Sequence, residues 1–442
     1  MLHGKRRVAC CLGLVLLALG CGPSSGRVAR KDAPDILVVV IDSLRADHVG
    51  AWGYSRDTTP FLDKWAKGAA LYRKAYTHGT HTRIAMASLF TGTFPTVHRI
   101  REVNLKQDQG PSDALVEGLT TWAESLRDAG YDTWALVSNP HISDDFGFTQ
   151  GFGHFWLTSS NYGATIKDKL FEDLKARSAE SAAKPLFLYL HFMDVHSPYQ
   201  PPPPWDTYFP SPPGHLVYAN WFHDVNANDL AYSMARYDGG IRSLDETLSQ
   251  LIPRWEATGT RPKAAVVLSD HGEEFMEHGG LGHGNSVFEE LAHVVFVVKG
   301  PAIAPGVYDE PVCHADAHRL VLDWAGATVP EIARGRQRAD WGRLPPPLYT
   351  ESKEWVGYRS GQRLLVVNRA HPRRRSYYDR ATDPAELKPL EDHETLHELN
   401  REMERLIGND NAIADSLNAP RRKVANKETA ERLKALGYVD AH

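Results

Sequence analysis

The chain has 442 residues, of which 42% are hydrophobic and 24% are charged, and its 50 basic and 55 acidic residues give a formal net charge of −5. This balance is typical of a folded protein with one large α/β domain and a smaller appendage. It excludes a strongly basic surface of the kind that attracts nucleic acid. The densest basic run, Arg373 to Arg375, is only as long as a solvated turn. We therefore expect no nucleic acid among the partners.

The N-terminus has the pattern of an export signal. Basic residues at positions 5–7 precede an apolar stretch at positions 8–20, which is too short to span a bilayer comfortably. A glycine comes directly before Cys21, which resembles a bacterial lipoprotein signal with Cys21 as the lipidated residue; a plain secretory signal is the alternative. We expect residues 1–21 to be a signal peptide and residues 22–33 a tether. The protein would then be exported and would face the periplasm or cell surface, touching the membrane only through its lipid anchor.

Strand and helix patterns alternate over residues 34–344. The run from Asp35 to Ile41 is apolar on both faces, as in a central parallel strand covered by helices. Similar apolar runs lie at 133–137, 186–191, 264–268 and 294–298, and helical patterns lie at 59–70, 119–129, 166–178 and 230–255. This alternation predicts a catalytic α/β domain with a doubly wound, mostly parallel sheet flanked by helices.

The C-terminal part, residues 345–442, has a different pattern. Short strands separated by turns are predicted at 349–351, 355–358, 363–367 and 376–378, followed by helices at 394–407 and 427–436. We expect a small antiparallel sheet plus helix, forming a C-terminal α+β subdomain.

Polar residues stand where four of the predicted strands end. Because ligands of such sheets bind beyond the carboxyl ends of the strands, these residues are expected to share one site. They are Asp42, Asn139, His191 with His196, and Asp270 with His271. Two carboxylates and an imidazole, from Asp42, Asp270 and His271, can together hold a divalent cation.

Several segments resemble sulfatase-like enzymes of the alkaline phosphatase superfamily. They are IDSLRADH at 41–48, ASLFTG at 87–92, HFMDVHSPY at 191–199, SDHGE at 269–273, EHG at 277–279, GHGN at 282–285 and YYD at 377–379. The likeness covers nearly all of the chain from Asp35 to Val439. It implies an enzyme that hydrolyses or transfers sulfate or phosphate esters.

The nucleophile segment departs from the sulfatase pattern Cys/Ser-x-Pro-x-Arg. Counted back from the TG pair at 91–92, the resemblance places the nucleophile at Thr82 and the proline and arginine positions at Ile84 and Met86. A threonine cannot become formylglycine by the sulfatase route, so no formylglycine is expected. Thr80 is the alternative nucleophile if the register is shifted.

These departures resemble the threonine branch of the superfamily, which includes phosphoethanolamine and phosphoglycerol transferases. In that branch a metal-bound threonine hydroxyl attacks phosphorus or sulfur. The resemblance implies that Asp42, Asp270, His271 and Thr82 hold the metal, and that His196 and His283 contact ester oxygens or protonate the leaving group. Asn139 and His191 are candidates for substrate contacts or for supporting roles, and His78 and His81 are either ligands or solvent-exposed.

The resemblance implies one divalent ion, Ca²⁺, Mn²⁺, Zn²⁺ or Mg²⁺, and leaves open a second ion held with His196 or His283. A small-molecule or polysaccharide ester is the expected substrate. A second hypothesis is a catalytically impaired, surface-anchored binding protein, because Met86 and Ile84 replace residues of the nucleophile pattern. The sequence indicates no oligomeric state.

Overall fold

The computed structural model describes residues 29–101, 112–116, 118–217, 225–343, 348–417, 421–423 and 426–435. The predicted signal peptide, Cys21 and most of the predicted tether lie outside these residues. Among the described residues, none of the helices combines the length and apolar character needed to cross a bilayer.

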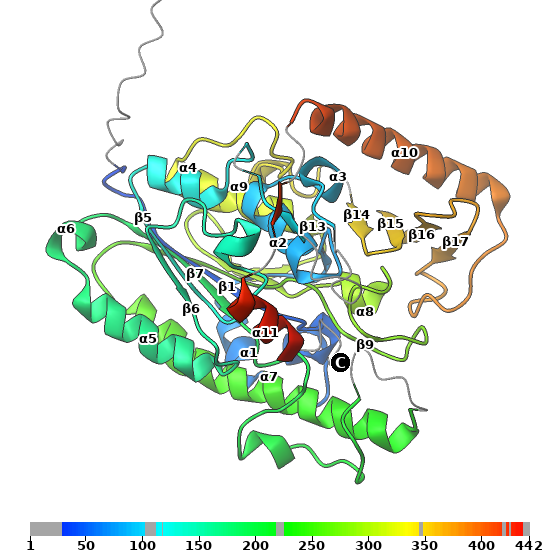
Figure 1. Cartoon of the computed structure of the whole chain (residues 1–442), viewed down its shortest axis with the longest axis horizontal. Helices are drawn as coiled ribbons and strands as arrows, with labels where there is room; N and C mark the ends of the chain where they lie inside the picture. The colour runs from blue at the N-terminus through cyan, green and yellow to red at the C-terminus, as the bar shows by residue number, and fades with distance from the viewer. Residues whose placement is uncertain are drawn as a thin grey trace, which may run out of the picture.

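An eight-stranded sheet with the order β12-β2-β11-β8-β1-β7-β5-β6 forms the centre of the molecule (Figure 1). Its strands are β12 (Gly306–Tyr308), β2 (Ala70–Tyr72), β11 (Phe296–Lys299), β8 (Lys263–Ser269), β1 (Asp35–Ile41), β7 (Leu186–Phe192), β5 (Asp132–Val137) and β6 (His154–Leu157). The strands from β8 to β6 pair in parallel, whereas β11 is antiparallel to both β8 and β2. The predicted, mostly parallel sheet is confirmed, and the run at 294–298 contributes its antiparallel strand.

Helices cover both faces of the sheet, because its central strands are apolar on both sides. One face packs against α2 (Thr82–Thr91), α4 (Trp122–Asp128) and α9 (His314–Ala325). The other packs against α1 (Pro60–Ala66), α5 (Gly163–Ala176) and α7 (Ala227–Glu256). Figure 1 shows α4 and α9 on one side of the sheet and α5 and α7 on the other. The helix predicted at 59–70 ends at Ala66, because β2 begins at Ala70.

A small antiparallel sheet lies beside α10 (His393–Asp415) at one end of the molecule (Figure 1). Its strands are β14 (Leu348–Glu351), β15 (Trp355–Ser360), β16 (Arg363–Asn368) and β17 (Arg375–Asp379). The last helix, α11 (Lys427–Ala435), packs back on the main domain, where Leu433 joins the core and Arg432 donates to the carbonyl of Ser138 at 3.1 Å. The predicted C-terminal antiparallel sheet with its helix is confirmed.

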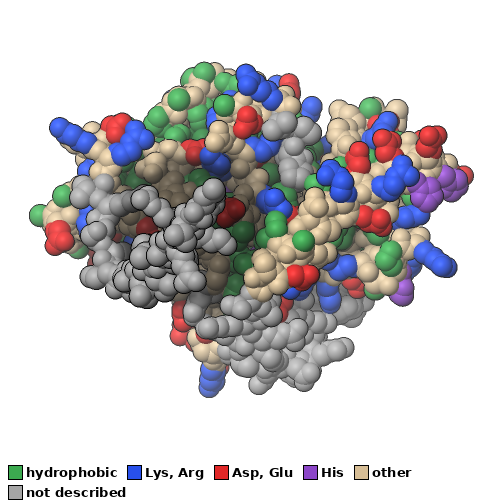
Figure 2. All heavy atoms as spheres, turned by 90° about the horizontal axis from the view of Figure 1, so that it is seen from above, with side chains coloured by type: hydrophobic (Ala, Val, Ile, Leu, Met, Phe, Trp, Pro, Cys, Tyr) green, Lys and Arg blue, Asp and Glu red, His purple; other side chains and the backbone are tan. Residues whose placement is uncertain are grey.

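The remaining elements are short connections. They are η1 (Ala46–His48), η2 (Gly50–Trp52), β3 (Ala75–Tyr76), α3 (Pro95–His98), β4 (Ser112–Ala114), η3 (Asp144–Phe146), α6 (Ala179–Ala182), η4 (Trp205–Thr207), β9 (Glu274–Phe275), β10 (Leu281–Gly282), α8 (Glu289–Ala292), β13 (Val312–Cys313), η5 (Arg338–Asp340) and β18 (Arg421–Lys423). On the face shown in Figure 2, basic and acidic side chains are interspersed. This distribution agrees with the nearly balanced charge of the sequence.

A histidine joins the main domain to the C-terminal subdomain. His278 shares a hydrogen bond of 2.8 Å with Glu290 through Nδ1 and donates from Nε2 to the carbonyl of Glu386 at 3.1 Å. Its ring stacks on Phe288, with centroids 3.6 Å apart. Burial alone would lower the pKa of His278, but the hydrogen bond and negative charge of Glu290 raise this pKa from 6.5 to about 8.

This raised pKa predicts that the stability contributed by His278 declines in mild alkali. The contribution is complete below the unfolded-state pKa of 6.5 and is lost as the pH rises through about 8. Because the ring is partly exposed to solvent, we expect an effect of about 1 kcal/mol. Thermal unfolding of the wild type and His278→Gln, measured between about pH 6 and about pH 9, should show a difference that shrinks with rising pH. A difference independent of pH would contradict the prediction.

Candidate active site

Polar side chains from four strands lie on one side of the sheet, at its carboxyl edge. Side chains alternate along a strand, so Asp42 continues the row of Val40, which packs toward α2. The same alternation brings Asn139 after β5, His191 of β7 and Asp270 after β8 to this side. Hydrogen bonds join Asn139 and His191 to Asp42, and His271 lies close to both Asp42 and Asp270, as the topology predicted.

Thr82 is the first residue of α2 and is fully buried. The preceding residue, His81, is extended, with φ −141° and ψ 141°, so the chain turns sharply into the helix. Gly79 permits this turn, because a Cβ at this position would lie 2.5 Å from Cγ2 of Ile84. The hydroxyl of Thr82 therefore lies at a helix N-terminus, where backbone N–H groups and the helix dipole favour negative charge.

The predicted metal ligands meet around the imidazole of His271. Its Nε2 lies 3.3 Å from Oδ2 of Asp270, 3.4 Å from Oγ1 of Thr82 and 4.0 Å from Oδ1 of Asp42. Ligand atoms held tetrahedrally at about 2.0–2.2 Å from one ion are about 3.3–3.6 Å apart. Oδ2 of Asp270 is buried and accepts no hydrogen bond from the described residues. These residues fit a divalent cation, which would satisfy this oxygen.

The two carboxylate oxygens of Asp42 have different environments. Oδ2 accepts a hydrogen bond of 2.6 Å from Asn139 and lies 3.0 Å from Nε2 of His191. Oδ1 accepts from the hydroxyl of Ser43 at 3.0 Å and faces His271. The donors on Oδ2 leave Oδ1 directed toward the ligand cluster. Ligand atoms of His191, Asp42 and Asp270 also lie within 4.8 Å of one another, but Nε2 of His191 directly contacts Oδ2, as a donor does.

Charge repulsion drives the pKa values of the two buried carboxyl groups, Asp42 and Asp270, apart. Burial and the negative charge of Asp42 raise the pKa of Asp270 well above its usual range. Burial also opposes ionisation of Asp42, but the hydrogen bond from His191 and the neighbouring imidazoles hold the pKa of Asp42 well below its usual range. Two carboxylates this close carry full charge together only when a cation compensates them.

Besides His191, five histidines lie together near the hydroxyl and the carboxylates. Their ring centroids are 4.3 Å apart for His271 and His283, 5.1 Å for His196 and His283, 5.9 Å for His81 and His283, and 5.1 Å for His81 and His141. Burial lowers the pKa of His271 to about 3 and that of His283 to about 4, so both rings are neutral near pH 7. Neutral imidazoles can ligate a metal or transfer a proton.

The two predicted substrate histidines are held by other groups. Nδ1 of His283 shares a hydrogen bond of 2.9 Å with Glu273, and Nδ1 of His196 donates to the carbonyl of Ser197 at 2.5 Å. These contacts fix the orientation of both rings. Burial also raises the pKa of Glu273 to about 7. The sequence patterns assign no role to Glu273 or His141, although Glu273 stands in the SDHGE segment.

The alternative candidates from the sequence lie in other surroundings. The hydroxyl of Thr80 donates to the carbonyl of Ser286 at 2.8 Å, which favours Thr82 as the residue facing the carboxylates. His78 is fully buried, shares a hydrogen bond with the carbonyl of Tyr349 and contacts Phe94. Neither His78 nor His81 is solvent-exposed.

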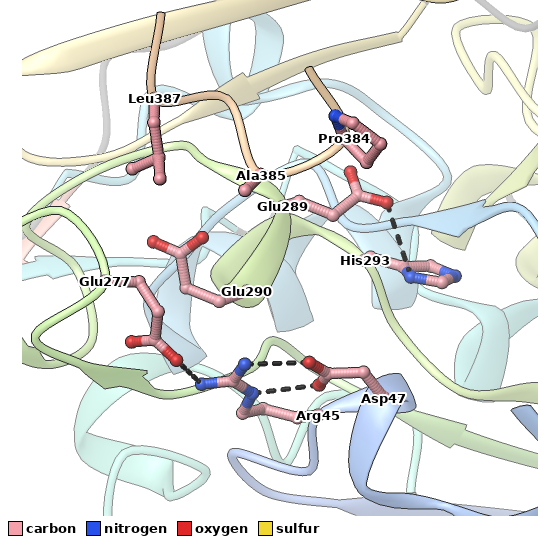
Figure 3. A pocket seen from close by; sticks show the side chains of 9 residues that line it. All are labelled: Arg45, Asp47, Glu277, Glu289, Glu290, His293, Pro384, Ala385 and Leu387. Atoms are coloured by element: carbon pink, nitrogen blue, oxygen red, sulfur yellow. Dashed lines mark hydrogen bonds and ion pairs between the residues drawn. The ribbon is translucent and has the colours of Figure 1, made fainter. Parts of the chain in front are cut away.

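A surface cavity is lined by none of the predicted site residues (Figure 3). It has a volume of about 320 Å³ and is lined by Arg45, Asp47, Glu277, Glu289, Glu290, His293, Pro384, Ala385 and Leu387. Figure 3 shows Arg45 between Asp47 and Glu277, and Glu289 beside His293. Arg45 also donates to the backbone carbonyl of Glu273 at 3.0 Å. Most of the acidic groups that line the cavity are thus already paired within the protein.

Comparison with known proteins shows which family has this fold. Residues 34–327 match the family model described as Sulfatase. The choline-sulfatase of Rhizobium meliloti is 24% identical over 367 residues, which cover 68% of this chain and 69% of that protein. The Kdo(2)-lipid A phosphoethanolamine 7''-transferase of Salmonella typhimurium is 26% identical over 273 residues, covering 58% of this chain and 42% of that protein.

A solved structure in complex with its substrate, D-glucosamine-2-N,6-O-disulfate, has the same fold. Its TM-score is 0.67 at 18% identity, and the alignment covers 87% of this chain and 99% of that one. A doubly wound α/β domain whose strand ends gather carboxylates, imidazoles and a helix-terminal hydroxyl defines a class of ester-processing enzymes. The chain belongs to the sulfatase family. It is accordingly an ester hydrolase or transferase of the alkaline phosphatase superfamily, acting on sulfate or phosphate esters.

Proposed function

We propose that this protein is a metal-dependent hydrolase or transferase of sulfate or phosphate esters that uses Thr82 as its nucleophile. The supporting observation is the spacing of Oγ1 of Thr82 and Oδ2 of Asp270 around Nε2 of His271, at 3.4 and 3.3 Å. Members of the family generally depend on a divalent metal, and Asp42, Asp270, His271 and Thr82 would hold it, because the oxygens of the other three lie 3.3–4.0 Å from Nε2 of His271. When bound, the cation would lower the pKa of the Thr82 hydroxyl and neutralise charge on the ester.

The residues of the chain then have distinct roles. The oxygen of Thr82 loses its proton and forms a bond to phosphorus or sulfur, while the bond from that atom to the ester oxygen breaks. A neutral imidazole, His196 or His283, takes up the proton that Thr82 loses and then gives it to the departing oxygen. The N–H groups at the start of α2 stabilise negative charge on the transferred group. Water or a second alcohol then attacks the threonyl ester and releases Thr82.

The substrate is a small-molecule or polysaccharide ester. Two observations support this proposal: a relative named choline-sulfatase and a neighbouring structure bound to a sulfated glucosamine. The phosphoethanolamine transferase among the relatives supports phosphoryl transfer as the related chemistry.

Trapping the threonyl intermediate tests this function. The purified protein, supplied with Mn²⁺, Zn²⁺, Ca²⁺ or Mg²⁺, should hydrolyse an aryl phosphate, a phosphodiester or an aryl sulfate. Acid quenching during turnover should leave a phosphoryl or sulfuryl group on the peptide from Ala75 to Arg83, and fragmentation should place it on Thr82 rather than Thr77 or Thr80. A modified Thr80, or turnover with no modified threonine under any condition, would overturn the assignment.

A binding protein without turnover is the second candidate. Met86 favours it, because the arginine position of the nucleophile pattern holds a fully buried thioether. This function predicts tight binding of a divalent metal together with no turnover of any ester in the panel. A threonyl intermediate on Thr82 would exclude it.

We also propose that the protein is exported and anchored through a lipid on Cys21. The support is the sequence of residues 1–21 alone, which lie outside the described residues. Cells that express the protein and take up a labelled fatty acid should label the wild type but not Cys21→Ala. Cys313→Ala is the matched control, because Cys313 is buried and should leave the labelling unchanged. Equal labelling of Cys21→Ala would overturn the proposal.

A further inference from the structure

A chain of buried contacts connects the nucleophile helix to the carboxylate of Asp42. Sδ of Met86 lies 3.4 Å from the hydroxyl of Tyr189, and that hydroxyl lies 2.7 Å from Nδ1 of His191. Nε2 of His191 in turn lies 3.0 Å from Oδ2 of Asp42. All four side chains are fully buried.

The regular geometry of the helix α2 and the strand β7 brings these side chains into contact. Thr82 and Met86 are four residues apart on α2, so both project from the same face of the helix. Tyr189 and His191 are two residues apart on β7, so both project from the same face of the sheet. The helix therefore presents the proposed nucleophile and, one turn later, a contact to the pair on β7.

The hydrogen-bonding groups determine which atom carries each proton along this row of contacts. Because Nε2 of His191 faces a carboxylate, it carries the proton and donates to Asp42. Nδ1 of His191 then accepts, and the single proton of the Tyr189 hydroxyl occupies that shorter hydrogen bond. Methionine offers no proton, so Met86 packs against the phenol oxygen without competing for Nδ1 of His191.

We propose that Tyr189 and His191 are positioning residues of the metal site, which hold Asp42 with Oδ1 toward the metal. Position 86, where the sulfatase pattern has an arginine, here has no donor for Asp42, and the pair on β7 supplies one. Asn139 is the other side chain that donates to Oδ2 of Asp42. This inference rests on the proposed metal-dependent function.

Metal affinity tests the proposal independently of turnover. Competition with a coloured chelator should show that Tyr189→Phe, which removes only the hydroxyl, weakens Mn²⁺ binding by about tenfold, and that His191→Ala weakens it by about 10–100-fold. His191→Gln keeps an N–H donor near the position of Nε2 and should recover most of the loss. Tyr72→Phe is the matched control and should bind Mn²⁺ like the wild type, because Tyr72 is likewise fully buried but stands on β2, which pairs with neither β1 nor β7.

Pulsed electron paramagnetic resonance of the Mn²⁺ protein separates positioning from ligation. The nitrogen coupling to the metal should be the same in the wild type and in His191→Gln, because His271 is the nitrogen ligand in this proposal. Loss of a coordinated nitrogen in His191→Gln would make His191 a ligand and overturn the proposal. Folded Tyr189→Phe and His191→Gln proteins with wild-type affinity, and no weakening in His191→Ala, would overturn it as well.

The outcomes also separate this inference from the proposed function. A wild type that binds metal, shows these affinity losses and turns over no ester would contradict the function and uphold the positioning role. Turnover through Thr82 with unchanged affinities in the variants would do the reverse. A wild type that binds no divalent metal would overturn both.

Discussion

Replacing Thr82 with alanine should lower ester turnover by about 10³-fold or more, while the protein remains folded. The substitution removes the only hydroxyl that lies within 3.5 Å of both Nε2 of His271 and Nδ2 of Asn139 among the described residues. Alanine is accepted at the start of a helix and leaves the packing of α2 intact. The measurement is the rate with the best ester of the panel at saturating metal, with circular dichroism as the check on folding.

Two variants locate the effect at this hydroxyl. Thr82→Ser keeps an oxygen at the same place and should retain activity within about tenfold. Thr80→Ala removes the hydroxyl that donates to Ser286 and should leave the chemical step nearly unchanged. If Thr82→Ala were as active as the wild type, Thr82 would not be the nucleophile. If Thr80→Ala alone were inactive, the register of the nucleophile segment would be shifted.

The sequence predicts the main strands closely where burial leaves no alternative. The strand from Asp35 to Ile41 is predicted to the residue, because all seven positions are buried and every position after Asp35 is apolar. The predicted strands at 186–191 and 264–268 fall within β7 and β8. The direction of β11 could not be predicted, because an apolar run of this length is the same in parallel and antiparallel pairing.

The positions of the candidate ligands could also be anticipated from the sequence. Strand ends in a parallel sheet meet at one edge, so Asp42 and Asp270 were expected to converge although they lie far apart in the chain. The functions of supporting groups could not be anticipated in this way. Tyr189 and His191 are indistinguishable in sequence from core residues of β7, and Glu273 contacts His283 only because of a particular turn between them.

Replacing Asp270 with asparagine should stabilise the metal-free protein and destabilise the metal-bound one. Burial and the charge of Asp42 raise the pKa of Asp270, so protonation at this site stabilises the metal-free fold. That stability is lost as the pH rises from the ordinary value of 3.8 through the raised pKa, so near pH 7 the buried carboxyl group beside Asp42 costs stability that a neutral side chain does not. Asparagine removes one charge and retains Oδ1, which accepts from the backbone N–H groups of Ser43 and His271.

We expect metal-free Asp270→Asn to be more stable than the metal-free wild type by about 1–3 kcal/mol near pH 7. A bound cation reverses the order, because it compensates both carboxylates of the wild type and adds about 2.7 kcal/mol when present at a hundred times its dissociation constant. The amide binds the cation more weakly and gains less. Differential scanning calorimetry with EDTA and then with Mn²⁺ or Zn²⁺ measures the stability of both proteins in each condition and so detects this reversal.

A buried aspartate elsewhere in the fold provides the control. Asp245 accepts from the backbone N–H groups of Phe61 and Leu62 at the start of α1, and burial raises its pKa to about 6. Asp245→Asn should therefore change the melting temperature equally with and without metal. If Asp270→Asn behaved in the same way, with one shift in both conditions, Asp270 would lie outside the metal site. The reversal of the stability order by metal is specific to a carboxylate whose charge is unfavourable until a cation compensates it. It therefore tests the metal site even if no substrate is known.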